Sequence, residues 1–480
     1  MKDANQTGDR PNILFLFSDE HRSDAMGCAG HGLVKTPALD KLAERGTRFV
    51  NAYTPSPICV PARAALASGE YVHRTRCWSN AQAYEGEPKS WGHVIGNAGY
   101  RVESIGKLHY RSNREDHGFD HEHLPLYIKG GVGWIKGLLR NHEAVLDCSA
   151  YAQEIGSGDC DYTQYDVGVT RGACEWLQSA NRNDKQPWSL FVSWLRPHYP
   201  LTCPDEFFDL YPLEAMDEAR FLRDDQLPRH AVTREIRKNF NYDQHFNNET
   251  RQIARAGYYG LCSFLDAQIA EVLSTLESQG LADNTLVVYS SDHGDHNGDR
   301  RMWTKMSLYD ESTRIPMLIA GPDIPKGREI TTLTSLVDIF PTMTAAAGLP
   351  SMGDTKPGMP LQELANSSHR PRAILSEYHD GGSPTGMFML RTDQWKYNYY
   401  PGYEPELFNI QDDPDELNDL AGQNQYSHHQ VVCHRQLCEI VDPDVANQTA
   451  FKDQADCINR LGGIDAILQS EEYDFTPIGS

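Results

Sequence analysis

The segment PSPICVPARAALASG, residues 55–69, places a cysteine in surroundings that suggest chemistry. Pro61 has no backbone N–H to donate, so it fits the first turn of a helix that continues through ARAALASG. Cys59 would then lie just before a helix N-terminus, where backbone N–H groups and the helix dipole favour negative charge. Such a thiol could be a core residue, a nucleophile, a metal ligand or the precursor of another functional group. On its own, the core residue is the favoured interpretation.

Four further polar clusters each follow a short apolar run of the kind found in buried parallel strands. The runs at 12–17, 100–105, 189–195 and 285–291 end at Ser18-Asp19-Glu20, Gly106-Lys107-Leu108-His109, Arg196-Pro197-His198 and Asp292-His293-Gly294-Asp295. Helical patterns lie between the runs, for example at 36–46 and 254–280. This alternation predicts an α/β fold with a mostly parallel sheet covered by helices on both faces. Ligands bind beyond the carboxyl ends of such strands, so we expect the clusters to meet in one site.

The pattern changes from about residue 370. GMFMLRTDQWKYNYYPG predicts two strands around a turn at Thr392-Asp393, and ELFNIQDDPDE adds a short strand. A helix is expected near IDAILQS. We therefore predict a disordered N-terminus over 1–10, a large domain over 11–370 and a smaller C-terminal α+β unit with a short antiparallel sheet over 371–480.

Composition limits the partners and the location. The net charge of −23, from 44 Lys and Arg against 67 Asp and Glu, argues against nucleic acid or an anionic membrane surface as the main partner. No apolar run reaches 18 residues, so no transmembrane helix is expected, and the run 13–17 is too short for a signal-peptide core. Eleven cysteines at scattered spacing suit reduced thiols. We expect a cytoplasmic protein, or a periplasmic one if a leader has been removed.

CVPAR, residues 59–63, resembles the signature of the type I sulfatases, in which this cysteine is oxidised to formylglycine after translation. Further landmarks of that family are matched in order by RPNILFLFSDE, TPALDKLAERGTRFVNAY, GKLH, HGFD, SDHGD, LVDIFPTMTAAAG and ELFNIQDDPDE. SPICVPARA, WSNA and SDHGD look closest to the branch of choline sulfatases and phosphonate monoester hydrolases. The resemblance implies an alkaline-phosphatase-like fold, with 11–370 as the catalytic sulfatase domain.

The resemblance also implies a reaction, the hydrolysis of a sulfate monoester to an alcohol and sulfate. Hydrated formylglycine is a geminal diol: one hydroxyl attacks sulfur, and the other lets the covalent adduct collapse with release of sulfate. The residues that would hold one divalent metal are Asp19, Glu20, the modified Cys59, Asp292 and His293. Ca²⁺ is favoured for such a carboxylate-rich site, with Mn²⁺ or Mg²⁺ as alternatives. Glu20 departs from the Asp or Gln that family members carry at this position.

Six more residues receive roles from the resemblance. Arg63 would hold the modified side chain and the anion, and His198 would protonate the leaving group. The residues that would bind formylglycine, sulfate or substrate are Lys107, His109, Lys305 and Asn80. Taken singly, each has an ordinary structural interpretation, such as a surface Arg or Lys, a core His or a loop Asn.

The partners implied are a formylglycine-generating enzyme during maturation and a small-molecule or carbohydrate sulfate ester. Carbohydrate, choline and aryl sulfates all stay open, and homo-oligomers occur in this branch. Two other functions also stay open. A phosphonate monoester or phosphodiester hydrolase could use the same scaffold, because sulfuryl and phosphoryl centres are both tetrahedral and oxyanionic. A non-enzymatic binding protein could retain the cleft with Cys59 unmodified.

Overall fold

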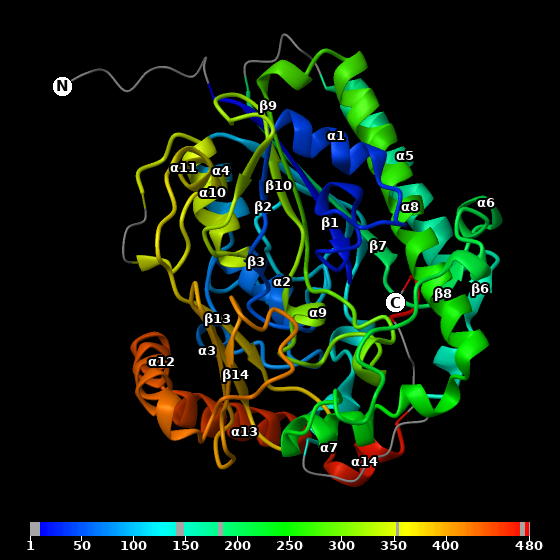
Figure 1. Cartoon of the computed structure of the whole chain (residues 1–480). Coiled ribbons are helices and arrows are strands. Elements are labelled where there is room, and N and C mark those ends of the chain that lie inside the picture. The colour runs from blue at the N-terminus through cyan, green and yellow to red at the C-terminus, as the bar shows by residue number, and fades with distance from the viewer. Residues whose placement is uncertain (1–9, 141–147, 181–185, 352–354, 471–475, 480) are drawn as a thin grey trace.

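The computed structural model describes residues 10–140, 148–180, 186–351, 355–470 and 476–479. The N-terminal segment predicted to be disordered, 1–10, lies outside these ranges except for its last residue. A large sheet runs through the middle of the molecule with helices on both sides, and a second, smaller sheet lies at one end (Figure 1). Within the described ranges, no helix combines the length and the apolar character needed to cross a membrane.

The large sheet is mixed but mostly parallel, as the sequence predicts. Its eight strands lie in the order β11 (Arg328–Ile330), β2 (Thr47–Phe49), β10 (Met317–Ala320), β9 (Thr285–Ser291), β1 (Asn12–Asp19), β7 (Trp188–Pro197), β4 (Arg101–Lys107) and β5 (His121–Leu126). The strands from β9 to β5 pair in parallel, while β10 runs antiparallel to both of its neighbours. The four strands that precede the polar clusters are therefore adjacent and run in one direction.

Strand β1 shows how the helices cover the sheet. Successive side chains of a strand point to opposite faces, so Phe15 and Phe17 pack into one layer while Leu14 and Leu16 pack into the other. The first layer contains α2 (Cys59–Ser68), α4 (Trp91–Asn97), α10 (Ile339–Ala346) and α11 (Leu361–Asn366). The second layer contains α1 (Pro37–Arg45), α5 (Asp161–Ser179) and α8 (Asn248–Ser278).

The C-terminal part has the predicted antiparallel sheet. Its strands lie in the order β13 (Ile374–Tyr378), β14 (Met387–Arg391), β15 (Trp395–Tyr399) and β16 (Glu406–Asn409). Three helices follow, namely α12 (Ser427–Ile440), α13 (Pro443–Arg460) and α14 (Ile464–Leu468). The short elements elsewhere are β3 (Ala52–Tyr53), β12 (Thr334–Ser335), β6 (Ile155–Ser157), β8 (Leu201–Cys203), α3 (Val72–Thr75), α6 (Asp205–Phe208), α7 (Ala231–Asn239) and α9 (Asp310–Thr313).

Two local features differ from the sequence prediction. Helix α2 begins at Cys59 itself, with Ile58 as its N-cap, whereas we expected Cys59 to lie just before the helix. Helix α5 is 19 residues long and has no counterpart among the helices expected from the sequence. The expected ends of α1, Thr36 and Gly46, are both correct.

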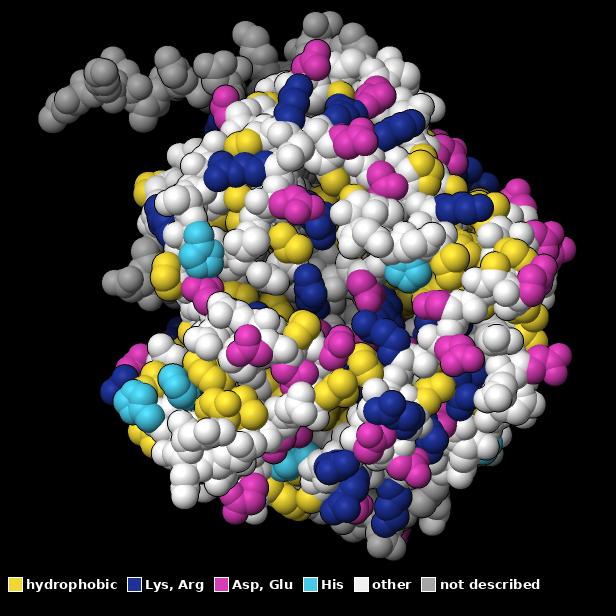
Figure 2. Space-filling model, viewed as in Figure 1, with side chains coloured by type: hydrophobic (Ala, Val, Ile, Leu, Met, Phe, Trp, Pro, Cys, Tyr) yellow, Lys and Arg dark blue, Asp and Glu magenta, His cyan; other side chains and the backbone are white. Residues whose placement is uncertain are grey.

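The surface carries both signs of charge. On the face shown in Figure 2, acidic and basic side chains are interspersed and form no continuous basic patch. The net charge of the chain is −23. An anionic ligand must therefore be attracted by cationic side chains concentrated locally, since the overall field of the protein repels it.

Candidate active site

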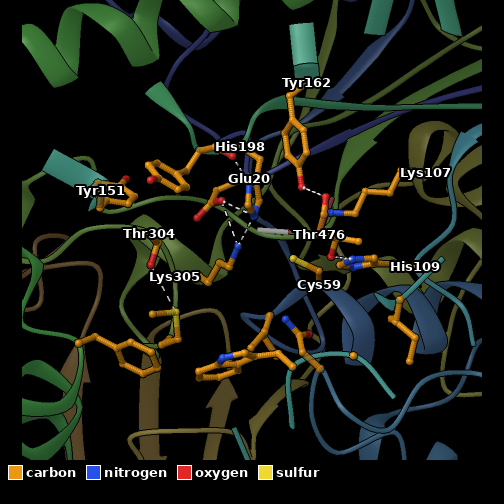
Figure 3. Close-up of a pocket in the computed structure, with 18 of the residues that line it drawn as sticks. Glu20, Cys59, Lys107, His109, Tyr151, Tyr162, His198, Thr304, Lys305 and Thr476 are labelled. Carbon is orange, nitrogen blue, oxygen red and sulfur yellow. Dashed lines mark hydrogen bonds and ion pairs between the residues drawn. The ribbon is translucent and has the colours of Figure 1, made fainter. Parts of the chain in front are cut away.

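Four adjacent strands deliver the predicted residues to one edge of the large sheet. Asp19 is the last residue of β1 and Lys107 is the last residue of β4. His198 follows β7 directly, and Asp292 follows β9 directly. Parallel strands end at the same edge of a sheet, and Cys59, at the start of α2, lies there too. Cys59, Lys107 and His198 line one pocket (Figure 3).

Cys59 lies in a buried cluster of carboxylate and imidazole groups. Its Sγ is 3.2 Å from His293 Nε2 and 3.7 Å from Asp19 Oδ1. His293 Nε2 is 3.6 Å from Asp292 Oδ1 and 3.7 Å from Asp19 Oδ1. One donor atom from each of these four residues lies within 4.8 Å of the others. The four residues could therefore hold a single metal ion.

Arg63, one turn beyond Cys59 on α2, ties the two aspartates together. Its Nε donates to Asp292 Oδ2 at 2.8 Å, and its NH2 group donates to Asp19 Oδ2 at 3.4 Å. Its NH1 group donates to the carbonyl of Lys107 at 2.9 Å and to Ser193 Oγ at 3.1 Å. Arg63 is buried and does not line the pocket. These contacts support a role in positioning the carboxylates more directly than a contact with the anion.

A second buried cluster joins Glu20, His198 and Lys305. Lys305 Nζ lies 3.1 Å from Glu20 Oε2 and 2.9 Å from His198 Nε2, and His198 Nε2 lies 3.4 Å from Glu20 Oε2. Burial, and then Lys305, lower the pKa of His198 well below its usual value. Burial also opposes the charge on Lys305, but the surrounding acidic groups outweigh it and raise the pKa of Lys305. Lys305 is therefore the cation of this cluster, and neutral His198 accepts its hydrogen bond.

Lys107 and His109 reach the pocket from the end of β4. Lys107 Nζ forms an ion pair with Asp19. His109 Nε2 is 2.8 Å from Thr476 Oγ1, and its Nδ1 is buried without a hydrogen-bond partner among the described residues. The hydroxyl of Tyr162 donates to the carbonyl of Thr476 at 2.8 Å, as Figure 3 shows. The segment 476–479 thus contributes to the pocket, which no motif in the sequence indicated.

The backbone at the site is strained. Four residues that are not glycine have positive φ angles around these side chains, namely Glu20 (67°), His109 (57°), Thr304 (59°) and Met306 (61°). Such conformations cost about 1–3 kcal/mol each and gather at functional sites, where the surrounding structure enforces them. The fold therefore holds Glu20, His109 and Lys305 in place before any ligand binds.

The pocket has a volume of about 110 Å³ and a partly aromatic wall. Asn80 lines it, and its Oδ1 accepts a hydrogen bond from the backbone N–H of Val60 at 3.0 Å. The aromatic lining residues are Trp134, Tyr151, Tyr162, Tyr199, Phe240 and Tyr242. No sequence motif assigned these aromatic residues to the site.

The donor set fits a divalent metal. Two aspartates and one histidine surround Cys59, and Asp19 also groups with Glu20 and His198. When Glu20 and the neighbouring Asp295 are both ionised, the buried Glu20 Oε1 receives no hydrogen bond from the described residues. Burial raises the pKa of Glu20, although Lys305 opposes the shift. A bound cation would relieve this cost of burying an unpartnered oxygen. The structure thus groups Glu20 with Asp19 and His198 rather than with Cys59, Asp292 and His293.

Comparison with known proteins is consistent with this geometry. Residues 11–349 match the family model described as Sulfatase, and residues 298–442 match the one described as N-sulphoglucosamine sulphohydrolase, C-terminal. Arylsulfatase K of Bos taurus is 31% identical over 440 residues, covering 86% of this chain and 78% of the relative. Choline-sulfatase of Rhizobium meliloti (strain 1021) is 31% identical over 432 residues, covering 86% of this chain and 83% of the relative.

Solved structures share the fold. The structure described as BT4656 in complex with its substrate D-glucosamine-2-N,6-O-disulfate superimposes with a TM-score of 0.74 at 23% identity, covering 93% of this chain and 99% of that one. The phosphonate monoester hydrolase of Agrobacterium radiobacter superimposes with a TM-score of 0.72 at 21% identity, covering 90% and 95%. Identities this low show the alkaline-phosphatase-like fold alone. Together with the family match over 11–349, they show that the chain belongs to the sulfatase family of sulfuric ester hydrolases.

Proposed function

We propose that this enzyme hydrolyses a sulfate monoester in the pocket around Cys59, and that Cys59 acts after conversion to formylglycine. The observation that carries the proposal is the position of Cys59 Sγ, 3.2 Å from His293 Nε2 and 3.7 Å from Asp19 Oδ1, in a pocket that Lys107 and Lys305 also line. The names of the two relatives at 31% identity, arylsulfatase K and choline-sulfatase, support a sulfate ester as substrate.

The surroundings of Cys59 disfavour an unmodified thiol as the nucleophile. Burial, and then the charge of Asp19, raise the pKa of the Cys59 thiol to about 11. Only the thiolate is a strong nucleophile, and at neutral pH a thiol with this pKa is almost entirely protonated. Formylglycine removes this obstacle, because its hydrate supplies an oxygen nucleophile.

The metal would be held by Asp19, Asp292 and His293, with Glu20 and the modified side chain 59 completing the set. Ca²⁺ suits this oxygen-rich set, and Mn²⁺ or Mg²⁺ are the alternatives. When bound, such an ion supplies positive charge that polarises oxygen atoms of the nucleophile and the ester. Arg63 would hold the two aspartates in position for the metal through its hydrogen bonds to Asp292 Oδ2 and Asp19 Oδ2.

Two ammonium groups and one imidazole of the pocket fit the anionic end of the substrate. Lys107 and Lys305 line the pocket, and His109 Nδ1 is a buried nitrogen without a partner among the described residues. Three such groups can bind the oxygens of one sulfate by charge-assisted hydrogen bonds. Asn80 Oδ1 is used by Val60, which leaves Nδ2 as the group that Asn80 can offer to the substrate.

Other features of the chain extend the proposal. A pocket of about 110 Å³ suits a small-molecule ester or a single sugar unit, and aryl, choline and carbohydrate sulfates are the candidates. The partner in maturation would be a formylglycine-generating enzyme. We further propose a catalytic domain over 11–370 and a C-terminal subdomain over 371–480. All eleven cysteines are free, which supports a reducing, cytoplasmic environment.

Paired assays test the proposed function. We expect hydrolysis of 4-nitrophenyl sulfate to exceed hydrolysis of the matched phenylphosphonate monoester, because both share one leaving group and differ only in the reacting centre. Mass spectrometry of the peptide 55–69 should show formylglycine at position 59 when the protein is co-expressed with a formylglycine-generating enzyme. A faster phosphonate reaction would assign the enzyme to phosphonate esters, and a purely thiol peptide in active material would remove the modification from the mechanism.

Replacing His198 with alanine should slow esters with poor leaving groups more than esters with good ones. His198 Nε2 lies in the pocket 2.9 Å from Lys305 Nζ, from which it can take up a proton and pass it to the departing oxygen. General acid catalysis is worth roughly 10²–10⁴-fold, and a 4-nitrophenolate needs little of it. The check is the slope of log kcat/KM against leaving-group pKa over a series of aryl sulfates, which should become steeper. An unchanged slope with a uniform loss would leave His198 with a binding role only.

Replacing Thr476 with valine should raise KM for the sulfate ester by roughly three- to tenfold. The substitution removes the hydroxyl 2.8 Å from His109 Nε2 with little change in volume, and one hydrogen bond is worth about 0.5–1.5 kcal/mol. Thr449→Val is the matched control, because Thr449 is partly buried on α13, makes one hydrogen bond through its hydroxyl and does not line the pocket. Steady-state kinetics of both variants test this prediction. A KM of Thr476→Val equal to that of Thr449→Val would show that the Thr476 hydroxyl does not contribute to substrate binding.

A further inference from the structure

Asn80 is held by three hydrogen bonds that point in different directions. Its Oδ1 accepts from the backbone N–H of Val60, the residue after Cys59, at 3.0 Å. Its carbonyl accepts from the backbone N–H of Trp134 at 3.3 Å. Its own backbone N–H donates to Asp380 Oδ2 at 2.7 Å, across 300 residues of chain. The first bond connects Asn80 to the turn that presents Cys59, and the last connects it to the C-terminal part.

Asp380 is buried just after β13 and does not line the pocket. Its second oxygen, Oδ1, accepts from the backbone N–H of Gly381 at 2.7 Å. Gly137 packs so closely that a Cβ at that position would lie 2.1 Å from Asp380 Oδ1. Both oxygens of the carboxylate are therefore hydrogen-bonded, and close packing restricts its position. The carboxylate in turn holds the backbone N–H of Asn80 in place.

Two more carboxylates of the C-terminal part hold the same segment, 73–80. Asp453 Oδ2 on α13 accepts from Trp78 Nε1 at 2.8 Å. Glu377 Oε1 on β13 accepts from the backbone N–H of His73 at 3.2 Å. Of these three carboxylates, Asp380 is the one that bonds to Asn80 itself. A substitution of Asp380 should therefore affect the pocket most directly.

We propose that Asp380 is a positioning residue of this enzyme. Its carboxylate fixes the backbone of Asn80, and Asn80 in turn fixes Val60 beside Cys59 and aims its amide at the substrate. An ionised carboxylate suits this role because it only accepts hydrogen bonds and can serve two backbone donors at once. The inference rests on the proposed function, since its main readout is the hydrolysis of a sulfate ester.

The substitution Asp380→Asn tests the inference. It replaces one acceptor oxygen by a donor at nearly constant volume, so one of the two backbone N–H groups loses its partner. We expect kcat/KM for 4-nitrophenyl sulfate to fall about tenfold, the equivalent of one lost hydrogen bond to a charged group, with a lower kcat and a higher KM. Asp380→Glu keeps the charge but displaces the oxygens, and it serves as the second variant if the amide fails to fold.

Asp266→Asn is the matched control. Asp266 is equally buried, and its two oxygens accept from the backbone N–H groups of Ala38 and Leu39 at 2.9 and 2.8 Å. It lies outside the pocket lining. We expect its substitution to lower the thermal stability as much as Asp380→Asn does, while kcat/KM per folded molecule stays at the parent value. A kcat/KM of Asp380→Asn equal to that of the parent enzyme would overturn the inference.

A double-mutant cycle separates transmission through Asn80 from a general loss of structure. In an Asn80→Ala background, Asp380→Asn should lower kcat/KM by a further factor of less than about two, because the effects of coupled residues are not additive. A full tenfold loss in that background would overturn the inference. A parent enzyme without sulfate ester hydrolysis would refute the proposed function instead. Hydrogen exchange would then decide: faster exchange of the Val60 amide in Asp380→Asn supports the inference, and unchanged exchange overturns it.

Discussion

Replacing Cys59 with alanine is expected to lower kcat/KM for sulfate ester hydrolysis by about 10⁴-fold or more, because the proposed nucleophile is lost. Alanine cannot be converted to formylglycine, and no other group in the cluster offers an oxygen nucleophile in the same place. Cys59 is 1% exposed and lies on a helix of small residues, so the missing sulfur leaves only a small cavity. The folded variant should still bind sulfate through Lys107, His109 and Lys305.

Cys148→Ala provides the control for this experiment. Cys148 is a second buried cysteine that lines the same pocket, so its substitution makes the same chemical change without removing side chain 59. We expect the activity of Cys148→Ala to stay within about threefold of the parent, as for most single changes outside the reacting groups. The measurement is kcat/KM on 4-nitrophenyl sulfate for protein whose peptide 55–69 has been characterised. Full activity in Cys59→Ala would end the proposed mechanism.

Asp19→Asn should remove most of the bound metal and lower kcat/KM by about 100-fold or more. Burial alone would raise the pKa of Asp19, but the positive charges of Lys107, Arg63 and Lys305 outweigh it and lower the pKa well below its usual value. Asp19 is therefore a carboxylate at neutral pH, and it belongs to both groups of side chains that could hold a metal ion. Charge stabilisation by a metal is worth several kcal/mol, and each 1.36 kcal/mol is tenfold in rate.

The control for Asp19→Asn is Asp338→Asn. Asp338 is also buried and paired with an arginine, since its oxygens accept from Arg372 at 2.8 and 2.9 Å, but it lies outside the pocket lining. Elemental analysis of the purified variants should show metal loss in Asp19→Asn alone. Added Ca²⁺ in excess should restore part of the Asp19→Asn activity by mass action. Unchanged metal content in Asp19→Asn would show that Asp19 does not bind the metal.

The positions at strand ends could be predicted from the sequence because a simple rule governs them. Buried parallel strands are apolar runs, and the polar residues that follow them share one edge of the sheet. Asp19, Lys107, His198 and Asp292 obey this rule, and they come together although up to 273 residues separate them. Lys305 follows no strand, and only its resemblance to a family motif assigned it to the site.

The aromatic wall and the contact at Thr476 could not be predicted in this way. Tyr162 lies on α5, whose buried face was not recognised in the sequence, and Thr476 reaches His109 across 367 residues. The bond between Asp380 and the backbone of Asn80 carries no sequence signal either, since any residue but proline offers the same N–H. Such contacts depend on how whole layers pack, which local patterns do not encode.

Helix α2 has a consequence for how the active protein arises. All ten of its residues are buried, from Cys59 to Ser68. In the folded protein, a modifying enzyme would therefore have no direct access to the main chain around Cys59. The oxidation that we propose must therefore take place on the growing or newly made chain. A molecule that folds before it is oxidised keeps the thiol at position 59. The specific activity of a preparation therefore depends on how fast oxidation is relative to folding.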